Sequence, residues 1–384
     1  MKVLILSCNT GGGHNAAGRA IRASFAEKGI PCDLQDTLSF ASPLRESFVC
    51  KGHVFAYRYL PRLYGQAYQF VENHPPQKGR KSGVYRSNIS YADRIYQFIQ
   101  AQGYDTVICV HIFAATALTH ILQQHPGLVH SYFVATDYTC SPGASDAEMD
   151  AYIIPHPALT AEFAAAGIPA GRIWPLGIPV GQAFCQKGSR AQARLQLGLP
   201  EQRRVVLMMC GSMGCGPMRQ LAEGCLAELP SDSMLVAVCG DNRRLYEELS
   251  AIHSERLRVV GYTNQVSAYM DAADLLLSKA GGLSSTEAVA KGLPILFVDA
   301  VPGVESRNRD FFAARGCALT ADGTEALVAL VAESLNRPQQ LQALVEAQKD
   351  FPKNAARQLT EAICRQAAIP PRSAATAPAR EENE

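Results

Sequence analysis

The sequence predicts an α/β protein built from two doubly wound domains, each a parallel β-sheet with helices on both faces. Short apolar segments alternate with helical patterns through the first half of the chain, and the alternation begins again after Gly198-Leu199-Pro200. The 384 residues suffice for two domains of roughly 100–200 residues each. The hydrophobic share of 47% and charged share of 18% are ordinary for globular chains, so each half can bury a core.

The N-terminal domain is predicted at residues 1–185. It opens with an apolar strand at 3–7, a glycine turn at 10–14 and a helix at 15–28 that Gly29 ends. Strand, glycine turn and helix form one βα unit of a parallel sheet. Apolar, β-branched or aromatic runs predict further buried strands at 105–111, 130–136 and 151–154.

The C-terminal domain is predicted at residues 200–349, after a linker at 181–194. Its strands are expected at 205–210, 234–239, 257–260, 274–278 and 295–298, with helical patterns between them. A helix at about 350–366 is a candidate to pack back on the first domain. The last segment, 367–384, is rich in Ala, Pro and charge and is expected to be a disordered tail.

Composition excludes several function classes. The net charge of +1 gives no global sign of nucleic-acid binding. The 12 cysteines include no Cys-x-x-Cys pair, and several lie in apolar runs, which favours a reduced, cytoplasmic chain. The N-terminal apolar run becomes polar too soon for a signal peptide. No apolar run reaches the ~18–20 residues of a spanning helix, so we expect any membrane contact to be peripheral, at the cytoplasmic face.

Residues 45–97 are basic and aromatic, with nine Lys or Arg against three Asp or Glu. One interpretation is a solvated helix pair. The other is docking on an anionic membrane, where basic residues contribute ~1 kcal/mol each and aromatic side chains enter the interface. The aromatic candidates are Phe55, Tyr57, Tyr59, Tyr64 and Tyr68.

The first glycine turn, Gly11-Gly12-Gly13-His14, follows a predicted strand and precedes a helix. A helix N-terminus favours negative charge, and glycines let a ligand or backbone approach closely. The pattern is equally typical of plain turn chemistry. His14 is either an exposed first-turn residue or a general base for an acceptor hydroxyl, since an unperturbed pKa of ~6.5 suits proton removal near neutrality.

A second glycine loop, at 210–217, follows the strand at 205–210. Gly211, Ser212 and Gly214 would present backbone N–H donors at a helix start, which suits a diphosphate better than a plain turn. The loop lacks the Gly-Lys-Ser/Thr of a Walker motif. No Asp-x-Asp triplet occurs in the chain, so we expect no divalent metal or other cofactor.

Two further constellations follow later strands. Gly281 and Gly282 precede Ser284-Ser285-Thr286-Glu287, which fits a Ser-x-x-Glu capping box. Spacing alone favours that cap over a second interpretation, in which Glu287 accepts hydrogen bonds from ribose hydroxyls. In the other constellation, Glu305 and Asn308 lie three apart after the strand at 295–298, where both could face a sugar.

Taken together, these segments resemble glycosyltransferase family 28. The donor-binding signature of that family resembles residues 260–270, 274–282, 284–288 and 291–294. The branch that contains monogalactosyldiacylglycerol synthases and processive diacylglycerol glucosyltransferases resembles residues 9–14, 134–137, 175–180 and 302–305, with Asn308. The resemblance spans about residues 1–365. The family often has Gln at the position of Val304 and Gly at the position of Arg307.

The resemblance implies a GT-B fold, with two Rossmann-like domains facing across a cleft and a UDP-sugar donor held by the C-terminal domain. It implies ribose binding by Glu287, which then outweighs the capping box, and phosphate binding by the 210–217 loop. It places Glu305 and Asn308 near the donor sugar, His14 as base and Asp137 beside the acceptor.

The implied reaction is inverting transfer of glucose or galactose from the UDP-sugar to diacylglycerol. Two alternatives stay open: transfer of N-acetylglucosamine to a polyprenyl-linked cell-wall intermediate, and a nucleotide-sugar sensor without turnover. A sensor would need Glu287 and the phosphate loop but has no use for a base, so His14 with Asp137 favours an enzyme.

Overall fold

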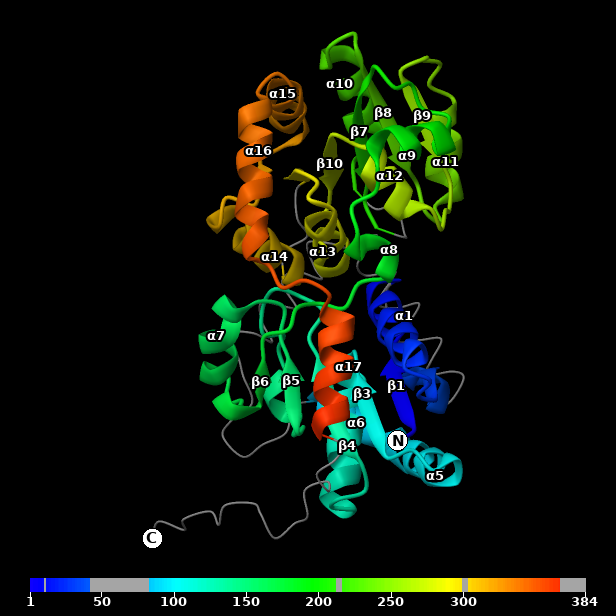
Figure 1. The fold of residues 1–384 in the computed structure, drawn as a ribbon, viewed down its shortest axis with the longest axis vertical. Helices are drawn as coiled ribbons and strands as arrows, with labels where there is room; N and C mark the ends of the chain where they lie inside the picture. Colours follow the sequence, from blue (N-terminus) through cyan, green and yellow to red (C-terminus); the bar gives the residue numbers. More distant parts are fainter. Residues whose placement is uncertain (10–11, 42–82, 212–215, 299–302, 367–384) are drawn as a thin grey trace.

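Two parallel six-stranded sheets, one in each half of the chain, form the core of the protein (Figure 1). The computed structural model describes residues 1–9, 12–41, 83–211, 216–298 and 303–366. The strand order is β2-β1-β3-β4-β5-β6 in the first sheet and β12-β11-β10-β7-β8-β9 in the second. The predicted α/β class with two doubly wound domains is confirmed.

The first sheet contains every strand predicted for the N-terminal half, plus two that the apolar pattern missed. Its strands are β1 (Val3–Ser7), β2 (Cys32–Asp36), β3 (Thr106–Cys109), β4 (His130–Val134), β5 (Ala151–Ile153) and β6 (Ile173–Trp174). Strand order reverses at β1, because the chain first adds β2 on one side and then β3 on the other. Ligands of open α/β sheets bind at the carboxyl ends of strands beside such a reversal.

The second sheet repeats this plan with the reversal at β7. Its strands are β7 (Arg204–Met209), β8 (Ser233–Val238), β9 (Leu257–Val260), β10 (Leu275–Ser278), β11 (Ile295–Phe297) and β12 (Ala318–Thr320). Strand β7 pairs with β8 on one side and β10 on the other. The carboxyl ends of β7 and β10 are therefore neighbours, and these are the strands that precede the predicted donor loops.

Helices cover both faces of each sheet (Figure 1). In the first half they are α1 (Gly12–Glu27), α4 (Gly83–Asn88), α5 (Ala92–Gln102), α6 (Ile112–Gln124) and α7 (Thr160–Ala165). Next come α8 (Gln182–Cys185), α9 (Arg190–Leu197), α10 (Met218–Glu228), α11 (Arg243–Ser250), α12 (Val266–Ala272) and α13 (Gly282–Lys291). The chain ends with α14 (Val304–Ala314), α15 (Thr324–Leu335), α16 (Pro338–Ala347) and α17 (Ala355–Gln366). None of the described helices combines the length and the apolar character needed to cross a bilayer.

The chain crosses between the sheets twice. It leaves the first sheet after β6 and passes through α8 and α9, so the segment expected as a linker, 181–194, is partly helical. It returns after α16, and α17 lies against the first sheet (Figure 1). Leu359 and Ile363 of α17 pack in one buried cluster with Val3 and Ile5 of β1.

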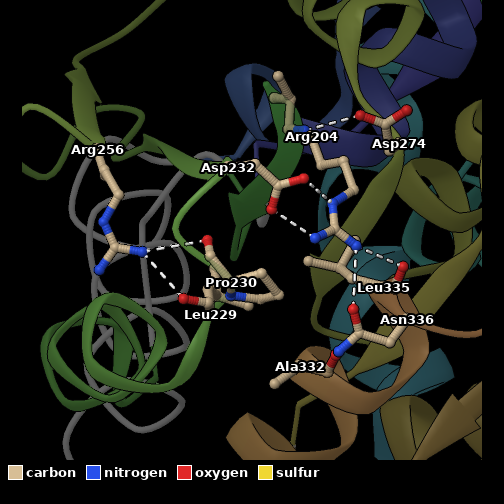
Figure 2. A network of polar contacts seen from close by, with 10 residues as sticks. Arg204, Leu229, Pro230, Asp232, Arg256, Asp274, Ala332, Leu335 and Asn336 are labelled. Carbon is tan, nitrogen blue, oxygen red and sulfur yellow. Dashed lines mark hydrogen bonds and ion pairs between the residues drawn. The ribbon is translucent and has the colours of Figure 1, made fainter. Parts of the chain in front are cut away.

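An arginine network fixes the amino ends of the second sheet, away from the predicted donor loops (Figure 2). Arg204 donates to both carboxylate oxygens of Asp232, at 3.0 and 2.5 Å, and to the carbonyl of Leu335 at 2.8 Å. The carboxylate of Asp274 accepts the backbone N–H of Val205 at 2.8 Å. Bidentate charge-assisted bonds impose geometry as well as attraction, so β7 is fixed at one end while its other end reaches the donor loops.

Candidate active site

The loops that follow the strands of the two sheets meet between the domains. Gly13, in the first turn of α1, would bring an added Cβ within 3.6 Å of Leu283 on α13. The Tyr138 hydroxyl lies 2.8 Å from the Thr286 hydroxyl of α13. The segment that carries the predicted base and the segment that carries the predicted donor-binding residues thus lie side by side, although they come from different halves of the chain.

His14 is the third residue of α1, and two groups of the first domain fix its ring. Its Nδ1 lies 3.0 Å from the carbonyl oxygen of Val110, just after β3, and 3.0 Å from the Thr136 hydroxyl oxygen, after β4. A carbonyl oxygen can only accept, so Nδ1 carries the hydrogen. The lone pair of the neutral imidazole is then on Nε2, which is the tautomer a general base needs.

The charge state of His14 also suits a base. Burial lowers the pKa of the imidazole below its ordinary value, while the negative charge of Asp137 and the Val110 carbonyl oppose that shift. The ring is therefore neutral at pH 7. His111 packs edge-on against it, with ring centroids 4.6 Å apart.

Asp137 follows β4 and supports His14 through charge. The described hydrogen bonds of the imidazole go to Val110 and Thr136, so these two groups orient the ring. Burial raises the pKa of the Asp137 carboxyl. The hydrogen bond from Asn308 and the charges of His14 and Lys279 lower that pKa, and the charge of Glu305 raises it.

Glu287 lies inside α13, and the capping-box interpretation is wrong. The helix begins at Gly282 with Gly281 as its N-cap, so Ser284 is already in the first turn. Glu287 faces Arg19 of α1, is half-buried, and forms no hydrogen bond with the described residues. Burial raises the pKa of its carboxyl to about 8, and the Arg19 charge opposes that shift. At pH 7 this carboxyl is therefore largely protonated, and a buried polar group without a hydrogen bond in the protein is a candidate for bonding a ligand hydroxyl.

Lys279, which directly follows β10, places a cation beside the described part of the predicted phosphate loop, and no role was predicted for it from the sequence. Gly211 follows β7 with φ at +72°, and a Cβ there would lie 2.9 Å from the Cε of Lys279. The Lys279 ammonium donates to Glu305 at 2.6 Å. In the sequence, the only sign of such a role for Lys279 is that it directly follows a buried strand. Glu305 therefore lies at the predicted phosphate site as well as near the predicted sugar site.

Gly282 lies at a close contact between the two domains. A Cβ at this position would lie 1.9 Å from the carbonyl oxygen of Thr136, a distance no real side chain tolerates. Glycine is therefore required for α13 to start against the end of β4. Gly12 and Gly13 lie in the first turn of α1, because that helix begins three residues before the predicted start at residue 15.

Asn308 on α14 is fully buried, and its amide bonds to the first domain and to its own. It contacts Asp137, Tyr138 and Ala280. Three predicted site residues, Gly11, Ser212 and Gly214, lie outside the described residues. So do most of the basic and aromatic stretch, including its five aromatic candidates, and the predicted tail. Among the described residues, no group of three His, Cys, Asp or Glu side chains is arranged to hold a metal ion.

Comparison with known proteins adds two family matches that cover successive parts of the chain. Residues 14–180 match the family model for monogalactosyldiacylglycerol (MGDG) synthase, and residues 205–360 match the glycosyltransferase family 28 C-terminal domain.

Curated relatives and solved structures extend the comparison. The chain is 23% identical over 357 residues to a processive diacylglycerol beta-glucosyltransferase of Staphylococcus carnosus, covering 91% of this chain and 88% of the relative. It is 25% identical over 364 residues to the same-named protein of Bacillus thuringiensis, covering 91% and 89%. Similar structures include Acinetobacter baumannii MurG, with a TM-score of 0.61, 14% identity and coverage of 95% and 99%. Staphylococcus aureus MnaA with UDP gives a TM-score of 0.63, 14% identity and coverage of 96% and 97%.

Proposed function

Because the chain belongs to the glycosyltransferases that join a monogalactosyldiacylglycerol synthase domain to a family 28 C-terminal domain, we propose that it transfers a hexose from a UDP-sugar to diacylglycerol. The names of the curated relatives support diacylglycerol as acceptor and favour glucose as the hexose. Similar folds crystallised with UDP, or with UDP-glucose in Anabaena HepE, support a uridine nucleotide as donor.

The observation that carries the proposal is the contact of His14 Nδ1 with the Val110 carbonyl at 3.0 Å, in a ring whose pKa burial lowers. A neutral ring that donates from Nδ1 has its lone pair on Nε2. Nε2 takes the proton of the acceptor hydroxyl. The hydroxyl oxygen then attacks the anomeric carbon from the face opposite UDP. The bond from that carbon to the diphosphate oxygen breaks, and UDP leaves with the electron pair. The product is a β-glycoside with inverted configuration.

The C-terminal domain supplies positive electrostatic potential where negative charge develops on the leaving diphosphate. The N-terminus of α13 begins at Gly282, and Lys279 lies beside Gly211. Preorganised donors of this kind contribute ~2.7–4 kcal/mol each in other enzymes. Glu287 accepts the ribose hydroxyls. With a lysine and a helix N-terminus placed here, we propose that transfer needs no divalent metal.

We also propose peripheral contact with the cytoplasmic face of an anionic membrane. Its support is the excess of basic residues at 45–97. Sedimentation with vesicles that contain or lack anionic lipid tests it. Binding that weakens with salt and needs the anionic lipid supports the contact, and binding indifferent to lipid charge and to salt refutes its electrostatic part.

Separate incubations with UDP-glucose, UDP-galactose and UDP-N-acetylglucosamine, each with diacylglycerol vesicles and followed by lipid mass analysis, test the function. We expect a hexosyl-diacylglycerol product with a hexose donor, and no product from the His14→Ala variant. Product formed only with UDP-N-acetylglucosamine and a polyprenyl-linked acceptor would reject diacylglycerol. UDP-sugar binding without transfer to any acceptor would reject an enzyme in favour of a sensor.

A further inference from the structure

Asn308 joins the donor domain to the residue beside the base. It is fully buried, on the first turns of α14. Its amide nitrogen donates to Asp137 Oδ1 at 2.9 Å and to the Ala280 carbonyl at 2.9 Å. Its amide oxygen accepts the Tyr138 backbone N–H at 2.6 Å. Two of these three bonds cross between the domains.

The orientation of this amide is determined by its partners. A backbone N–H can only donate, so the Tyr138 side must receive the amide oxygen. A backbone carbonyl can only accept, so the Ala280 side must receive the amide nitrogen. The second hydrogen of that nitrogen then points at Asp137 Oδ1. The donor domain thus offers this carboxylate a directed hydrogen bond from a rigid, buried group.

We propose that Asn308 is a positioning residue that acts through Asp137: it holds the carboxylate ionised beside His14 only while the donor domain is docked. The inference rests on the proposed function and adds a coupling between docking and the base. The bond crosses from α14 to the loop after β4, so separating the domains removes it. The catalytic pair would then be complete only with the donor domain in place.

The charges around Asp137 show why one hydrogen bond matters. His14 on α1 and Lys279 after β10 favour its ionised form, while burial and Glu305 on α14 oppose it. A hydrogen bond to a carboxylate lowers its pKa. Without Asn308, Asp137 would hold its proton to higher pH. His14 would then lose part of the negative charge that offsets its own burial, and it would become a weaker base.

The position has two rival explanations. Asn308 could contact the donor sugar directly, in which case its loss would weaken donor binding. It could also only dock the domains, in which case any buried hydrogen bond across the same contact would serve equally. The Tyr138–Thr286 hydroxyl pair, at 2.8 Å, is such a bond and does not involve the Asp137 carboxylate. Tyr138→Phe is therefore a matched control.

The experiment titrates the His14 ring by NMR without substrates, with the signal assigned by comparison with His14→Gln, and separately measures kcat and KM. For Asn308→Ala we expect the His14 pKa to fall by about half a unit or more. We expect kcat to fall roughly 10–100-fold, with KM for the UDP-sugar nearly unchanged. Tyr138→Phe leaves the His14 titration in place. In an Asp137→Asn background, adding Asn308→Ala changes the titration no further.

An unchanged His14 titration in Asn308→Ala, or a loss confined to KM, would overturn the inference, as would a Tyr138→Phe titration shifted equally. If the alanine variant does not fold, Asn308→Leu keeps most of the volume and is read by the same measurements. The titration needs no substrate. A wild-type protein that makes no glycolipid would therefore reject the proposed function, while the comparison of His14 titrations would still decide the role of Asn308.

Discussion

Replacing Glu287 with glutamine should stabilise the protein and weaken its donor binding at the same time. Burial raises the pKa of this carboxyl from 4.5 to about 8. Each pH unit between the two values is worth about 1.4 kcal/mol. Because the folded protein must therefore take up a proton that the unfolded chain has released, folding loses about 3 kcal/mol at pH 7 and about 1 kcal/mol at pH 5. Solvent contact of this half-buried side chain reduces the first figure to about 2–3 kcal/mol.

The sign follows from the direction of the shift. A carboxyl whose pKa is higher in the folded protein contributes stability below pH 4.5, and that contribution is lost as the pH rises through about 8. Glutamine stays neutral and escapes this loss. For a domain of this size, 1 kcal/mol corresponds to roughly 2–4 °C. We therefore expect Glu287→Gln to melt about 5–10 °C above the unsubstituted protein at pH 7.5 and close to it at pH 5.

Calorimetry at the two pH values measures the difference, with Glu228→Gln on the exposed end of α10 as control. UDP affinity, measured by titration calorimetry at pH 7.5, should fall about 2–13-fold, because the carboxyl is largely protonated there and a neutral hydrogen bond contributes about 0.5–1.5 kcal/mol. A variant that melts below the unsubstituted protein at pH 7.5 would refute the reasoning. So would a stability difference that does not change with pH.

Four further predictions follow from the site. His14→Ala should lower kcat by ~10²–10⁴ with UDP affinity nearly intact, and near-normal turnover would remove His14 from the role of base. Because burial places the His14 pKa below 6.5, the kcat/KM profile should reach half its maximum below pH 6.5; a midpoint above pH 7 would contradict this. Gly282→Ala should destabilise the fold by about 1–3 kcal/mol by forcing α13 off Thr136 and should lower activity with it, whereas Gly171→Ala, which meets nothing within 4 Å, should retain both. Chelation with EDTA should leave the rate unchanged, and a loss that Mg²⁺ restores would reject metal-free transfer.

The sequence was most informative where strands are continuously apolar. Strands such as β7 and β8 are buried along nearly their whole length, and their apolar runs predicted them within a residue or two. Strand β2 (Cys32–Asp36) was missed because this edge strand carries Asp and Gln and is only partly buried. Strands β6 and β12 (Ala318–Thr320) were missed as well, and they have only two and three residues. Apolar runs reveal buried strands, and the missed strands were the edge and short ones.

For the candidate active site, the sequence predicted which end of each sheet carries the site residues, but it did not predict their hydrogen-bond partners. Parallel strands end together, so residues that follow β1 and β4 lie at the same edge of the sheet. The acceptor for His14 is a backbone carbonyl 96 residues away in sequence. Any residue type at position 110 offers that carbonyl, so no residue pattern could mark it. Lys279 could have been found, since a lone cation directly after a buried strand is uncommon.

The start of α13 shows tertiary contact overriding a local signal. Ser284 and Glu287 have capping-box spacing, yet the helix begins two residues before Ser284. Gly281 and Gly282 allow that earlier start, and only a residue without Cβ fits beside the Thr136 carbonyl at the domain contact. The earlier start carries Glu287 out of the first turn and turns it toward α1. The glutamate is thereby left without a backbone N–H to cap.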